Sequence, residues 1–99
     1  MAISAKIQTS IALFCNVVVF ESFAEMLNPH TRNEKLDTWE GFPDRMARYC
    51  VIHLSVNVKL PKSCAAECKE HARKTAWEIA SDKVRIMTEN PNQDSQNRD

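Results

Sequence analysis

Apolar residues recur at helical spacing from residue 63 to residue 89. At a period of 3.6 residues, one face of this segment is mostly small and apolar, interrupted only by Lys83. Pro61 precedes the segment and Asn90-Pro91 follows it, and Ser63 is the expected N-cap. The pattern predicts a helix at 63–89 whose small residues let another element approach closely. The residues on its apolar face are Ala65, Cys68, Ala72, Ala76, Ile79, Ala80, Ile86 and Met87.

The first segment, residues 3–27, predicts a second helix with two apolar faces. It ends where Asn28 precedes Pro29. Between residues 11 and 20 the segment is apolar nearly all round, so we expect burial from several sides or contact with a partner chain. A buried strand at Val17–Phe20 is the alternative, since periodicity cannot distinguish the two in a short apolar run. The two faces are Ile3, Ile7, Ile11, Phe14 and Val18, and Ala12, Cys15, Val19, Phe23 and Met26.

The middle segment has two interpretations. Pro43 and Asp44 suit the first turn of a helix at 43–59, with Ala47, Cys50, Val51, Leu54 and Val58 on its core face. Alternating apolar residues from 51 to 60 also fit a β-strand. We favour the helix, because a strand needs a partner and the chain offers none better than residues 11–20. The strand at about 51–60 remains the α+β alternative.

The remaining segments are polar. Residues 29–37 form a connector, after which Trp39 and Phe42 follow Leu36 at a spacing of three. These three residues could fold as a lid over the first helix, or Trp39 could anchor an interface. The tail at 91–99 has no apolar residue, so we expect it to be disordered. The sequence therefore predicts a single small domain at 1–90.

Composition supports helices and argues against several functions. The 99 residues include one glycine, whereas antiparallel sheets usually need glycine in their turns. A net charge of zero argues against a protein that is held to nucleic acid by bulk electrostatics. The beginning of the chain resembles a signal peptide faintly, but polar residues interrupt it. We expect reduced thiols, a cytoplasmic location and no membrane span, since Ile11–Phe20 is too short to cross a bilayer.

Cysteine and histidine form the only set of residues that could carry chemistry. Cys50, His53, Cys64, Cys68 and His71 could hold zinc if both segments are helical, but their spacing fits no common zinc motif. No nucleophile elbow, phosphate-binding loop or HExxH accompanies them. We therefore expect free thiols, no metal, no cofactor and no enzymatic activity.

These patterns predict a mainly α fold, a small bundle of three helices at about 3–27, 43–59 and 63–89. The expected function is that of a small intracellular binding protein that acts on another protein chain, either a second copy or a heterologous target. An accessory or inhibitory factor, for example a phage- or host-encoded inhibitor, works in this way. The alternative is a zinc-stabilised nucleic-acid-binding or regulatory adaptor. The residues expected at the interface are Phe14, Val17, Val18, Phe20, Trp39 and Phe42.

Overall fold

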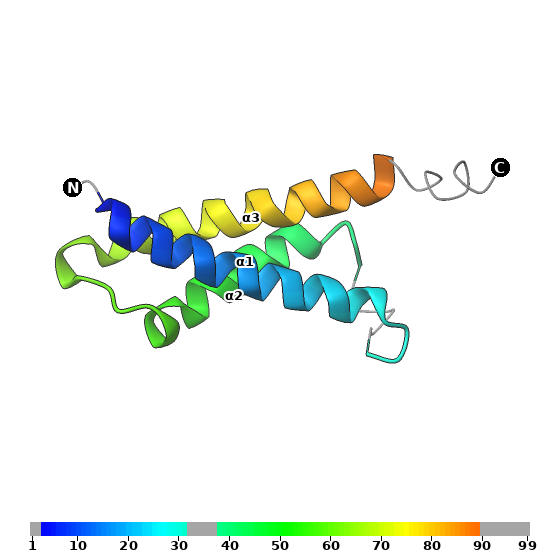
Figure 1. The fold of residues 1–99 in the computed structure, drawn as a ribbon, viewed down its shortest axis with the longest axis horizontal. Coiled ribbons are helices and arrows are strands. Elements are labelled where there is room, and N and C mark those ends of the chain that lie inside the picture. The colour runs from blue at the N-terminus through cyan, green and yellow to red at the C-terminus, as the bar shows by residue number, and fades with distance from the viewer. Residues whose placement is uncertain (1–2, 32–37, 90–99) are drawn as a thin grey trace.

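Three α-helices make up the fold in the computed structural model, which describes residues 3–31 and 38–89 (Figure 1). A short 3-10 turn, η1, leads from the second helix into the third. The predicted three-helix architecture is confirmed. The predicted tail at 91–99 lies outside the described residues. The elements in chain order are α1 (Ala5–Leu27), α2 (Phe42–Asn57), η1 (Lys62–Cys64) and α3 (Ala65–Glu89).

The α+β alternative is wrong, because α2 continues through the residues that alternate like a strand. On this helix Leu54 faces the core and is 0% exposed, whereas Ile52 is 68% exposed and Val56 is 83% exposed. The alternation therefore reflects apolar residues on both sides of a helix. The strand considered at Val17–Phe20 is wrong too, since those residues belong to α1. Neither described range contains a strand.

Local chemistry sets the helix ends. The Ser4 hydroxyl accepts a hydrogen bond from the Ile7 backbone N–H at 3.3 Å, so α1 begins at Ala5, two residues later than predicted. Helix α2 ends at Asn57, because Val58 turns to an extended conformation with φ −131° and ψ 128°. Ser63 lies inside η1 and does not cap α3, so the predicted cap is wrong.

Helix α3 packs along both other helices, while α1 and α2 touch each other much less. The small residues of α3 make this possible, because Cys68, Ala72, Ala76 and Ala80 are all fully buried. The Cys15 thiol of α1 donates to the Ala72 carbonyl at 3.6 Å, which brings these two helices close together. Since α1 is held mainly from one side, its opposite side remains open.

Candidate interaction surface

A strip of exposed apolar residues runs along the open side of α1. Leu13, Val17, Phe20 and Leu27 are 63%, 55%, 64% and 57% exposed, and Ala24 between them is exposed as well. Alternating steps of four and three residues keep all five on one side of the helix. We call these five residues the outer strip. Because the opposite side of α1 lies in the core, this helix is apolar on two faces.

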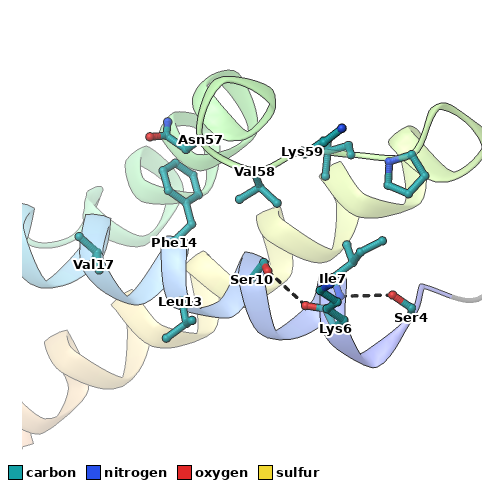
Figure 2. Close-up of a pocket in the computed structure, with 12 residues that line it drawn as sticks. Ser4, Lys6, Ile7, Ser10, Leu13, Phe14, Val17, Asn57, Val58 and Lys59 are labelled. Carbon is teal, nitrogen blue, oxygen red and sulfur yellow. Dashed lines mark hydrogen bonds between the residues drawn. The ribbon is translucent and has the colours of Figure 1, made fainter.

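A groove borders the outer strip near the beginning of α1. Ile7 and Phe14 form one wall and the connector from Val58 to Pro61 forms the other, enclosing about 820 Å³. Figure 2 shows Phe14 reaching from α1 toward α2 beside Asn57, while Leu13 points away from the connector. Lys6 and Lys59 also line this connector groove. Weak packing between α1 and α2 leaves the groove open.

Lys83 of α3 borders the strip on its other side. Its ammonium lies 5.8 Å from the ring centroid of Phe20 and 5.5 Å from that of Phe23, within the range of cation–π attraction. A hollow of about 520 Å³ adjoins this contact and is also lined by Val17 and Glu21. Lys83, the one charged residue in the apolar pattern of α3, therefore lies over aromatic rings at the edge of the outer strip.

The structure separates the six residues expected at the interface. Val17 and Phe20 belong to the outer strip, and half-buried Phe14 lines the connector groove. Val18, at 9% exposure, and Phe42, at 0%, belong to the core, so their side chains are not available at the surface.

Trp39 is half-buried and forms an aromatic cluster with Phe23 and Phe42. The ring centroid of Trp39 lies 5.2 Å from that of Phe23 and 5.6 Å from that of Phe42. This is part of the lid considered from the sequence, but it covers Phe23 and leaves the outer strip open. Leu36, the third expected lid residue, lies outside the described residues.

The cysteine and histidine residues do not converge on one point. Within residues 3–31 and 38–89, no group of three Cys, His, Asp or Glu side chains is close enough to hold a metal ion. Cys64 and Cys68 are neighbours, with 3.7 Å between their sulfur atoms. His53 lies instead against Tyr49, with 4.2 Å between ring centroids, and His71 is half-buried.

All four cysteines are buried in the core, where they act as small apolar residues. A hydrogen bond with Cys15, together with burial, raises the pKa of the Cys50 thiol far above its ordinary value of 9.0. Burial, together with neighbouring Cys64, raises the pKa of Cys68 in the same direction. The folded state therefore favours the protonated forms of Cys50 and Cys68, whereas the same hydrogen bond with Cys50 lowers the pKa of Cys15.

We expect the free energy of unfolding to fall as the pH rises above about 9, because thiols ionise in the unfolded chain before Cys50 ionises in the fold. The loss from this thiol is about 1.4 kcal/mol for each pH unit. Urea unfolding at several pH values measures it, with Cys50→Ala as the control. An equally steep loss in Cys50→Ala would show that other groups cause the pH dependence.

A second exposed apolar surface lies on α2 and α3 and was not expected from the sequence. Tyr49, Ile52 and Val56 are 45%, 68% and 83% exposed along α2. Trp77 of α3 is 43% exposed, and its indole N–H donates to the Asp44 carboxylate at 3.1 Å. The spacing of the three α2 residues was a usable signal, but the strand alternative at 51–60 placed Ile52 and Val56 on the same face as Leu54.

Helix α1 is also long and apolar enough to cross a membrane, judged by length and composition only. It has 23 residues, and its most apolar window has a mean hydropathy of 1.6 and is 28% buried. The expectation that this segment is too short considered residues 11–20 alone, whereas the helix extends well beyond them. Core helices of soluble proteins and signal sequences share these properties, so the observation by itself is weak evidence.

Compared with known proteins, the chain gives no significant match to a family model, a curated protein or a solved structure.

Proposed function

We propose that this chain is a small, non-catalytic binding protein that contacts another protein chain through the outer strip of α1. The observation that carries the proposal is the exposure of four large apolar side chains in one line on a helix whose other face is already buried. Scattered apolar residues are ordinary on protein surfaces, but a continuous strip beside a groove is typical of an interaction site.

Energetics support a partner. Full burial of a Val, Leu or Phe side chain contributes roughly 1.5–3 kcal/mol, and more than half of each large strip residue remains in water. Covering the strip would recover several kcal/mol, a sizeable share of the roughly 5–15 kcal/mol that stabilises a typical domain. An accessory or inhibitory factor gains its affinity in this way, by occupying a surface of its target.

Charge and thiols support a protein partner inside the cell. A net charge of zero gives no bulk attraction to a polyanion, which favours protein over nucleic acid. Cysteines that fill the core as free thiols suit a reducing compartment.

Two matched valine substitutions test the proposal. Val17→Asp introduces a charge into the outer strip, whereas Val56→Asp makes the same change at an exposed position on α2. Tagged versions are purified from the native host and their co-purifying proteins are compared by quantitative mass spectrometry. We expect Val17→Asp to lower the recovery of a specific partner by roughly 10-fold or more, since desolvating an unpaired charge at an interface costs over 1.4 kcal/mol.

The Val56→Asp variant should keep that partner. Unfolding by urea verifies that both variants remain folded. Equal recovery with wild type and Val17→Asp would contradict the proposed function.

A further inference from the structure

The spacing of the outer strip continues toward the beginning of α1. From Lys6 to Leu27, seven positions alternate steps of four and three residues, which is the heptad spacing of helices that pair along a seam. Six of the seven are exposed and Ser10 is half-buried, so the whole line faces away from the core. We call it the seam. Its residues are Lys6, Ser10, Leu13, Val17, Phe20, Ala24 and Leu27.

We propose that the seam pairs with the same seam of a second copy of this chain, with the two α1 helices antiparallel and Val17 at the two-fold axis. The inference rests on the proposed function and names its partner. A heptad seam about 30 Å long suits a second helix better than a flat protein surface. An identical helix is available wherever this chain is present, and a two-fold contact uses the same patch on both copies.

Side-chain sizes match in this arrangement. When Val17 faces Val17 of the second copy, Leu13 faces Phe20 and Ser10 faces Ala24 of that copy. This pairing is possible because the seam residues have nearly the same spacing on either side of Val17. Large residues therefore meet large residues and small ones meet small ones. The seam is therefore self-complementary in size in the antiparallel orientation about Val17. A parallel pair would also match sizes, since each residue would meet its own copy, so the charges distinguish the two orientations.

Charges favour the same orientation. Helix α1 carries Lys6 in its first turn and Glu21 and Glu25 near its end, and Lys59 lines the connector groove beside its first half. Antiparallel pairing brings the lysine-bearing half of one copy alongside the glutamate-bearing half of the other, where the negative end of the α1 dipole also lies. In a parallel pair, Lys6 would face Lys6 of the second copy and the like charges would repel.

Sedimentation of the full chain tests the pairing. A single helix pair is a small interface, so we expect a dimer at tens of micromolar that dissociates on dilution, at roughly micromolar concentration. Val17→Asp should weaken the dimer by roughly 100-fold, since it opposes two like charges at the axis. Val56→Asp, the matched change outside the seam, should leave it unaltered.

Cysteine cross-linking tests the orientation. Ser10→Cys and Ala24→Cys are small changes at seam positions that face each other only in the antiparallel pair. Under mild oxidation, a mixture of the two variants with different tags should form the mixed disulfide at least about 5-fold faster than either variant alone, because thiol exchange requires access and proximity. The four native cysteines are buried, so the wild-type chain supplies the blank.

The possible outcomes affect the orientation, the self-pairing and the proposed function differently. Cross-linking of each variant mainly to itself would overturn the antiparallel orientation. A wild-type monomer at high concentration, together with a heterologous partner lost in Val17→Asp, would overturn self-pairing and leave the proposed function standing. A monomer that loses no partner in Val17→Asp would refute both. Binding to vesicles of phosphatidylcholine and phosphatidylglycerol that Val17→Asp abolishes would identify a lipid surface in place of either protein partner.

Discussion

Replacing Phe42 with alanine should lower the free energy of unfolding by about 3–5 kcal/mol. Phe42 is 0% exposed and is the largest fully buried side chain among residues 3–31 and 38–89. It packs against Phe23 and Trp39, with ring centroids 6.1 Å and 5.6 Å away. Its removal would leave a cavity where the beginning of α2 meets the end of α1. A loss of this size is a large part of the stability of a small domain.

Urea unfolding followed by far-ultraviolet circular dichroism measures this loss. Phe20→Ala is the matched control, because Phe20 is 64% exposed on the outer strip, where the Lys83 ammonium lies 5.8 Å from its ring centroid. We expect the control to cost less than about 1 kcal/mol, measured at a concentration where the chain is monomeric. Similar losses in the two variants would contradict the placement of Phe42 in the core.

Replacing Leu54 with alanine should cost about 2–5 kcal/mol. Leu54 is 0% exposed on the core face of α2, and Ile52, two residues earlier, is 68% exposed. Ile52→Ala should therefore cost less than about 1 kcal/mol. The comparison tests the helix directly, because a β-strand would place these two residues on the same face.

The same urea experiment measures both variants, and the unfolding slope shows whether each one unfolds in a single step. Equal losses at the two positions would support the strand that the structure rejects. A small loss in Leu54→Ala would mean that α2 packs into the core through a different face.

The sequence was sufficient to predict where the helices lie. Proline residues, the near-absence of glycine and the 3.6-residue apolar period determine backbone conformation through interactions between residues close together in the chain. It was less informative about which faces are buried. Val18 and Phe20 are both apolar, yet Val18 is 9% exposed in the core and Phe20 is 64% exposed to water. That difference depends on how α1 is rotated about its axis, which is set by contacts with residues far away in the chain.

The segment that links α1 to α2 shows the same limitation. Trp39 and Phe42 have the spacing of a lid, but the sequence does not specify which side of α1 they cover. The structure places them on Phe23, next to the end of α1, and the outer strip remains open. The seam, by contrast, was detectable from spacing alone, but the neighbouring apolar residues around α1 concealed it.

The alanine-rich face of α3 has a consequence for how stability changes with temperature. The heat-capacity change on unfolding, typically about 12–15 cal/mol/K per residue, grows with the apolar area that unfolding exposes to water. The α3 positions at the centre of the fold bury only methyl or thiol side chains, and several of the largest apolar residues are already exposed in the native state. Both facts place the heat-capacity change per residue toward the lower end of the range. The isolated chain consequently has a broad, shallow stability curve, in which modest stability extends over a wide span of temperature.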